Sequence, residues 1–77
     1  MIDEKLDVRG KMCPLPVAFT KHKLDAMTEG QMLEVTGEGK LEFDNIQQWT
    51  KRQGHKIVQT QKNNNEFKII IKKQNPT

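Results

Sequence analysis

The sequence has one cysteine, three prolines, one tryptophan and no tyrosine in 77 residues. A single cysteine excludes a disulfide bond within the chain, and nothing in the composition argues for an oxidising compartment. No apolar run approaches the roughly 20 residues that a membrane-spanning helix requires. The first five residues include acidic side chains and no apolar stretch, so we expect no secretory signal. These absences favour a cytoplasmic protein that does not engage a membrane.

Lysine and arginine number 13 against 10 acidic residues, which gives a formal net charge of +3. This excess is small and dispersed. It suits transient contact with an acidic partner surface and does not by itself indicate nucleic-acid binding. With 34% hydrophobic and 30% charged residues, the chain is expected to form a single domain over residues 1–77 around a modest core. Its structured part is expected at about residues 5–73.

Hydrophobic periodicity predicts four strands and two helices. The strands are expected at residues 6–9, 31–36, 56–61 and 66–72, and the helices at residues 14–27 and from Asp44 to just before Gly54. Two strand–helix–strand units favour right-handed parallel crossovers. The asparagine-rich linker at residues 62–65 suits a tight turn, so the last two strands should form an antiparallel hairpin. We therefore predict a mixed four-stranded sheet with two helices on one face.

The first helix is expected to bury one stripe of residues. Helical spacing predicts this stripe at Val17, Lys21, Leu24 and Thr28, widened by Ala18 and Met27. Gly30 is predicted to be the C′ residue after the helix, because glycine tolerates the left-handed conformation that ends helices.

The second helix is expected to start at Asp44 as N-cap, with Gln47 three residues later in a capping-box-like arrangement. Trp49 should anchor this helix on the sheet. In the last strand, alternation predicts that one face points to the core and that Ile70 points away from it. The predicted core residues of that strand are Phe67, Ile69 and Ile71.

The only cysteine lies where a strand pattern gives way to a helix pattern, in Arg9-Gly10-Lys11-Met12-Cys13-Pro14-Leu15-Pro16. Pro14 and Pro16 suit the first turn of a helix, because proline lacks an N–H that has no intrahelical partner there. Cys13 would then lie at or beside the N-cap, where unpaired amides favour an anionic sulfur. Helix N-termini and nearby cations, here Arg9 and Lys11, lower a thiol pKa from about 8.5 to roughly 3.5–7.5. The segment predicts an accessible, activated Cys13, although a lone cysteine is more often a buried, inert side chain.

The same residues carry a family resemblance. Residues 6–10, followed after a two-residue gap by Cys13-Pro14-Leu15-Pro16, resemble the TusA/SirA-like family of small sulfur-carrier proteins. The resemblance continues through Gly30, residues 33–35, residues 46–49 and Gly54-His55, so it covers almost the whole chain. It implies an α+β fold, a two-layer α/β sandwich with βαβαββ order. It also implies that Cys13 accepts sulfur as a persulfide and passes it on, with Gly10, Pro14, Leu15 and Pro16 as motif and positioning residues.

A sulfur carrier of this kind acts as a sulfurtransferase at the protein level and needs partners but no cofactor. The resemblance implies a sulfur-donor protein, such as a cysteine desulfurase, or a small sulfur compound, and a sulfur-acceptor protein. Nucleic acid would be involved only indirectly. The receiving pathway is open among tRNA thiolation, molybdenum cofactor assembly, sulfur oxidation and selenium metabolism. The absence of a second cysteine suits this role, because a nearby thiol could discharge the persulfide as a disulfide.

Other candidate chemistry is weaker. Residues 37–40, Gly-Glu-Gly-Lys, lack the spacing of a phosphate-binding loop and are read as a flexible connection. Many relatives carry Asp-Pro where this chain has Gly39-Lys40, which puts in doubt any partner contact inherited from that aspartate. Neither His22 nor His55 is expected to act as a base for Cys13. The one cysteine and the two histidines also lack a recognised metal-ligand spacing.

Two other functions remain open at this level. A non-enzymatic regulatory or interaction module could keep the fold while Cys13 is only structural. A small RNA-binding domain would fit the basic balance, although the sequence has no clustered basic stripe and no pair of exposed aromatic residues for base stacking.

Overall fold

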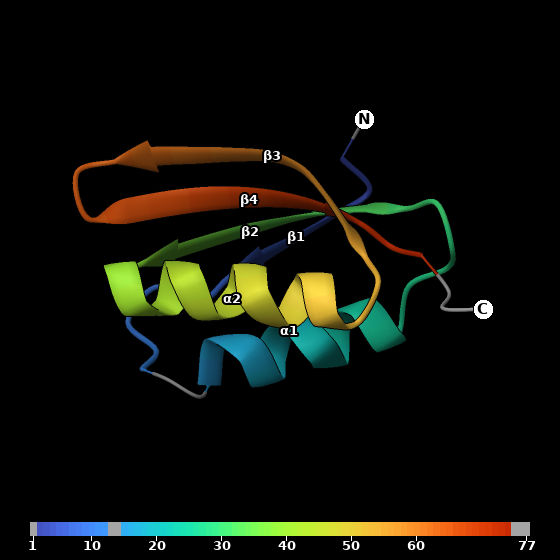
Figure 1. Cartoon of the computed structure of the whole chain (residues 1–77), viewed down its shortest axis with the longest axis horizontal. Coiled ribbons are helices and arrows are strands. Elements are labelled where there is room, and N and C mark those ends of the chain that lie inside the picture. Colours follow the sequence, from blue (N-terminus) through green and yellow to red (C-terminus); the bar gives the residue numbers. More distant parts are fainter. Residues whose placement is uncertain (1, 13–14, 75–77) are drawn as a thin grey trace.

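The computed structural model describes residues 2–12 and 15–74, which form a twisted sheet with two helices against one of its faces (Figure 1). The elements in chain order are β1 (Glu4–Asp7), α1 (Leu15–Asp25), β2 (Met32–Glu38), α2 (Lys40–Arg52), β3 (Lys56–Asn63) and β4 (Glu66–Lys72). The strand order across the sheet is β1-β2-β4-β3. β1 pairs with β2 in parallel, whereas β4 is antiparallel to both β2 and β3. The predicted βαβαββ order and mixed sheet are confirmed.

The core lies between the sheet and the helices and is built from alternate positions of the two central strands. Leu33 and Val35 of β2 pair with Ile71 and Ile69 of β4, and all four side chains are fully buried. Burying such side chains contributes about 1.5–3 kcal/mol each. Phe67 completes the inward row of β4 while Ile70 lies on the opposite face, so the predicted alternation of this strand is confirmed.

The predicted buried stripe of α1 is correct only in part. Leu24 and Met27 are buried and Val17 packs against the core. Lys21, Ala18 and Thr28 are exposed, and the helix buries Pro16 and Thr20 in addition. Lys21 instead pairs with Asp25 on the solvent side at 2.8 Å. The physical reason is the cost of burying an ammonium group without a partner, which exceeds the cost of burying a hydroxyl that finds one. Thr20 finds one within the helix, because its hydroxyl donates to the Pro16 carbonyl at 2.8 Å.

The end of α1 also differs from the prediction. The helix ends at Asp25, so Gly30 is not its C′ residue. Gly30 has a φ of +92° and lies in the turn that leads into β2, where its N–H donates to the Lys73 carbonyl. The left-handed conformation was thus assigned correctly to this glycine, but it shapes the entry to a strand.

The connection between β2 and α2 is much shorter than predicted. β2 continues through Gly37 to Glu38, and α2 begins at Lys40, four residues before the expected N-cap at Asp44. Gly39, with a φ of +99°, occupies the N-cap position without a side-chain cap. Starting the helix here places Phe43 on the buried face beside Ile46. Residues 37–40 are therefore structured and are not a flexible linker.

The predictions for Trp49 and for the asparagine-rich turn are confirmed in part. Trp49 is partly buried and packs against the core, with its ring centroid 6.2 Å from that of His55. The deeper anchors of α2 are Phe43 and Ile46. The hairpin is confirmed, but β3 runs to Asn63, and the turn carries a left-handed Asn64 with a φ of 60°.

The face of the sheet away from the helices carries charged side chains. Glu34 of β2 lies between Lys5 of β1 and Lys68 of β4, with N–O distances of 4.0 and 3.9 Å. Neighbouring strands therefore place charges of opposite sign side by side on this face. Within residues 2–12 and 15–74, neither helix is long and apolar enough to cross a membrane.

Candidate functional site

A tight turn follows β1 and leads toward Cys13. Val8 is buried, and its N–H extends the pairing with β2 by donating to the Thr36 carbonyl at 2.7 Å. The N–H of Lys11 then donates to the Val8 carbonyl at 3.1 Å, which closes a four-residue turn. Gly10, with a φ of +82°, occupies the third position, where a type II turn requires a positive φ. This turn explains the glycine in the motif.

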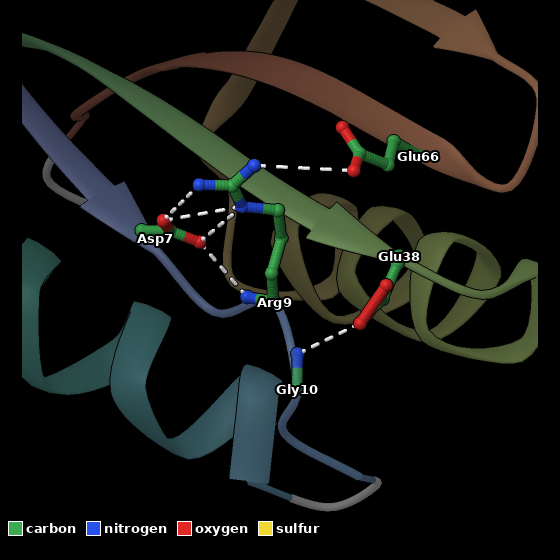
Figure 2. A network of polar contacts seen from close by, with 5 residues as sticks. All are labelled: Asp7, Arg9, Gly10, Glu38 and Glu66. Carbon is green, nitrogen blue, oxygen red and sulfur yellow. Dashed lines mark hydrogen bonds and ion pairs between the residues drawn. The ribbon is translucent and has the colours of Figure 1, made fainter.

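Asp7 and Arg9 hold the first half of the turn. The Asp7 carboxylate accepts hydrogen bonds from the Arg9 backbone N–H at 2.9 Å, from Nε at 3.0 Å and from Nη2 at 2.8 Å. The side-chain hydrogen bonds from Arg9, followed by its backbone N–H, lower the pKa of Asp7 to about 2. The Arg9 guanidinium also forms an ion pair with Glu66 of β4 (Figure 2), and its Nη1 lies 3.9 Å from the Glu66 Oε2. The charge of Arg9 is thus compensated by two carboxylates.

Glu38, the last residue of β2, holds the middle of the turn. Its Oε2 accepts a hydrogen bond from the Gly10 N–H at 3.0 Å (Figure 2). The three consecutive amides of Arg9, Gly10 and Lys11 therefore all have acceptors, on Asp7, on Glu38 and within the turn. Strands β1, β2 and β4 each contribute a carboxylate to this arrangement. The segment that precedes the cysteine is fixed by three strands of the sheet.

Exposed apolar side chains flank the cysteine in the sequence. Met12 is 75% exposed and Leu15 is 48% exposed. The Leu15 N–H donates to the Met12 carbonyl at 2.8 Å, and α1 begins at Leu15. Phe19, one turn into α1, is 42% exposed, with the Lys11 ammonium 5.6 Å from its ring centroid. Met12 and Leu15, the nearest described residues on either side of Cys13, are therefore both open to solvent.

The predicted site residues have the following positions. Cys13 and Pro14 lie outside the described residues. Gly10 and Arg9 lie in the fixed turn, Lys11 and Leu15 are exposed, and Pro16 is buried in the first turn of α1. The role predicted for Arg9 and Lys11 in lowering the pKa of Cys13 stays a prediction.

Three carboxylates of the site were missed by sequence reasoning. Asp7 had a local signal, because an aspartate often accepts a hydrogen bond from the backbone two residues later, as it does here from Arg9. Glu38 and Glu66 had none. Their position follows from the register of β2 and β4, which pairs them directly.

The two histidines lie away from this turn. His22 is exposed on α1. His55 follows α2, and its Nδ1 accepts the Gln74 N–H at 3.1 Å. Burial, followed by the charge of Lys73, lowers the pKa of His55 below its ordinary value. Among the residues that the structure describes, no three histidine, cysteine, aspartate or glutamate side chains gather closely enough to hold a metal ion.

Known proteins are similar to this chain in both sequence and fold. The family model described as "Sulfurtransferase TusA" matches residues 4–73. A protein of Methanocaldococcus jannaschii is 40% identical over 91% of this chain and 93% of its own length. "Sulfur carrier protein TusA" of Allochromatium vinosum is 31% identical over 92% of this chain and 93% of its own.

A solved structure supports the fold independently. The crystal structure of a SirA-like protein from Desulfitobacterium hafniense superposes with a TM-score of 0.74, at 23% identity, over 91% of this chain and 96% of that one. The match of the family model and the identity to its relatives span nearly the whole chain. This chain therefore belongs to the TusA family of sulfurtransferases.

Proposed function

We propose that this protein is a sulfur carrier that takes up sulfane sulfur on Cys13 as a persulfide and passes it to an acceptor protein. The supporting observation is the fixed turn at residues 8–11, which leads to an exposed Met12 directly before the cysteine. A carrier thiol has to be accessible to two partners in succession, while its backbone has to stay in one place. The family membership and the names of the relatives agree with this role.

The proposed reaction is a transfer of one sulfur atom without net oxidation. The Cys13 thiolate attacks the outer sulfur of a donor persulfide, R–S–SH. A new S–S bond forms, the S–S bond of the donor breaks, and the products are Cys13–S–SH and the donor thiolate R–S⁻. An acceptor nucleophile then attacks the terminal sulfur, the new S–S bond breaks, and the Cys13 thiolate is regenerated.

The start of α1 suits an anionic sulfur. Leu15 is the first residue of the helix, two positions after Cys13, and the positive end of the helix dipole stabilises negative charge. The first turn of α1 contains no acidic side chain that would repel such a charge. Thiols in such environments have lowered pKa values. The same helix dipole would stabilise the persulfide anion.

The proposal includes partners and a location. A cysteine desulfurase or a small sulfur compound would act as donor, and a second protein as acceptor. A cytoplasmic location fits, because thiols are kept reduced there. On the open face, Glu34 lies between Lys5 and Lys68, so an acidic side chain interrupts the basic ones there, which does not favour RNA binding at this place.

Mass spectrometry tests this function directly. The protein is incubated with a cysteine desulfurase and cysteine, and the expected result is one added sulfur on Cys13. Cys13→Ser is the control and should acquire none while remaining folded. If no sulfur donor gives an adduct on the wild-type protein, the carrier function is refuted and a regulatory module of the same fold is favoured. The rate of Cys13 alkylation as a function of pH should also report a pKa below the ordinary value of about 8.5.

A further inference from the structure

Glu38 bonds a residue that is far from it in the sequence. It ends β2, and its carboxylate accepts the Gly10 N–H from 28 positions earlier at 3.0 Å. The other two amides of the turn find their acceptors nearby, on Asp7 and on Val8. The bond to Glu38 is therefore the contact of the three that fixes the turn to the end of β2.

The position of Glu38 is costly for the sheet itself. It lies directly opposite Glu66 in the β2–β4 register, and like charges that face each other across two strands repel. Arg9 relieves this repulsion from the turn. Its guanidinium lies 3.9 Å from Glu66. The hydrogen bond and charge of Asp7 raise the pKa of Arg9 most, and the charges of Glu66 and Glu38 add to this effect. The Glu38 side chain therefore bonds the turn, whereas the residue directly across the β2–β4 pair has a charge of the same sign.

The bond also selects one orientation of the Arg9–Gly10 peptide. Type I and type II turns differ by a flip of this central peptide plane, and Gly10 is in the positive-φ form at +82°. In this form its N–H is directed at Glu38. After a flip, the Arg9 carbonyl oxygen would face the carboxylate instead, and two acceptors would repel. Glu38 therefore holds the turn in one state, three residues before Cys13.

We propose that Glu38 is a positioning residue for sulfur transfer, which keeps the segment leading to Cys13 aligned with the start of α1 by accepting the Gly10 N–H. This role rests on the function proposed above for Cys13. The end of β2 would thereby take part in the site, although it lies in a different segment of the chain from the cysteine motif.

The matched variants are Glu38→Gln and Glu38→Met. Both remove the charge and keep nearly the same length, but only glutamine keeps an acceptor for the Gly10 N–H. The charge effect therefore cancels in a comparison of the two. Glu34→Met is the control, because Glu34 lies on the same strand and face and pairs with Lys5 and Lys68, away from the turn. Glu38→Ala replaces Glu38→Met should methionine impair folding.

Three rates are measured in each variant: Gly10 amide exchange by NMR, Cys13 alkylation by iodoacetamide across pH, and transfer of sulfur from loaded Cys13 to cyanide. Loss of one hydrogen bond corresponds to a factor of about three to ten. In Glu38→Met we expect Gly10 exchange to be faster by this factor, and alkylation and transfer at neutral pH to be slower by it, than in Glu38→Gln. Glu34→Met should match the wild-type protein in all three.

Two results would overturn the proposal. One is equal Gly10 exchange in Glu38→Gln and Glu38→Met. The other is faster Gly10 exchange in Glu38→Met with unchanged alkylation and transfer, which would make the hydrogen bond a structural contact only. Alkylation needs no sulfur donor, so it reports the position of Cys13 even if the wild-type protein never takes up sulfur. Failure of the proposed function and failure of the positioning role are therefore distinguishable.

Discussion

The buried ammonium of Lys73 donates a hydrogen bond to the carbonyl of Leu24, in the last turn of α1. The Leu24 carbonyl also accepts the Met27 N–H at 3.0 Å, so Lys73 is its second donor. A cation is favoured beside the last carbonyls of a helix. The backbone of Lys73 meanwhile bonds Gln31 and Gly30 in the turn before β2. One residue after β4 therefore fixes both the end of α1 and the entry to β2.

Lys73→Met should destabilise the protein, because methionine fills the space of the lysine stem but cannot donate to Leu24. Hydrogen bonds from charged groups contribute about 1.5–3 kcal/mol, and each kcal/mol shifts the melting temperature of a domain of this size by about 4–8 °C. Thermal unfolding measures the loss. Lys72→Met, at the neighbouring position, is the control. Equal melting temperatures for the two variants would contradict a capping role for Lys73.

Thr50→Val should stabilise the protein. The Thr50 hydroxyl oxygen is buried and has no hydrogen-bond partner among the described residues, whereas valine has the same shape without the polar atom. Removing an unpaired buried hydroxyl is worth about 1 kcal/mol. Thr20→Val is the matched comparison, because the Thr20 hydroxyl donates to Pro16. Denaturant unfolding should show opposite signs for the two, and a loss of stability in both would contradict the assignment.

Gly37→Ala should destabilise the pairing of β2 with β4. Gly37 lies opposite Phe67, and a Cβ at this glycine would be 2.5 Å from the Phe67 Cζ. The ring cannot retreat freely, because it packs against Phe43 with centroids 5.2 Å apart. Overpacking of this kind costs about 1–3 kcal/mol.

A double-mutant cycle with Phe67→Leu tests this cause. The free energy of unfolding lost by Gly37→Ala should be smaller in the Phe67→Leu background, where the ring is absent. An equal loss in both backgrounds would mean that the contact with Phe67 is not responsible.

Asp7 should make stability depend on pH in the acid range. Its pKa in the folded protein, about 2, lies below the ordinary value of 3.8. The contribution of its carboxylate is therefore present above the unfolded pKa and is lost as the pH falls toward the folded pKa. Asp7→Asn should lower the melting temperature near neutral pH, and the difference from wild type should vanish near pH 2.

NMR titration of the Asp7 carboxyl carbon gives the pKa directly, and Asp44→Asn, on α2 away from the turn, is the control. A melting-temperature difference between wild type and Asp7→Asn that stays constant from neutral pH to pH 2 would contradict this linkage.

Local patterns predicted β4 with its bounds, because Phe67, Ile69 and Ile71 lie at alternate positions and asparagines mark the preceding turn. They failed where a distant contact decides the outcome. Gly37 resembles a loop residue until Phe67 is seen to pack on it from the neighbouring strand. Asp44 and Gln47 have the spacing of a capping box, but α2 starts earlier at a glycine that caps without a side chain. Thr20 is buried because its hydroxyl is satisfied, which apolar periodicity cannot reveal.

For the candidate site too, features set by local patterns could be predicted and features set by distant contacts could not. The turn at Gly10 and the place of Pro16 in the first turn of α1 could be predicted, because glycine and proline act through local backbone geometry. The carboxylates of Glu38 and Glu66 were invisible, because they reach the turn only through strand register.

The sheet order has a consequence for synthesis. β4 lies between β2 and β3, yet it is the last of the four strands to leave the ribosome. Until residues 66–72 emerge, β2 has no antiparallel neighbour and the arginine beside the motif lacks its second counter-ion. In the nascent chain, Cys13 would therefore be attached to an incomplete sheet. We expect sulfur donors to load it productively only after the last strand has been synthesised.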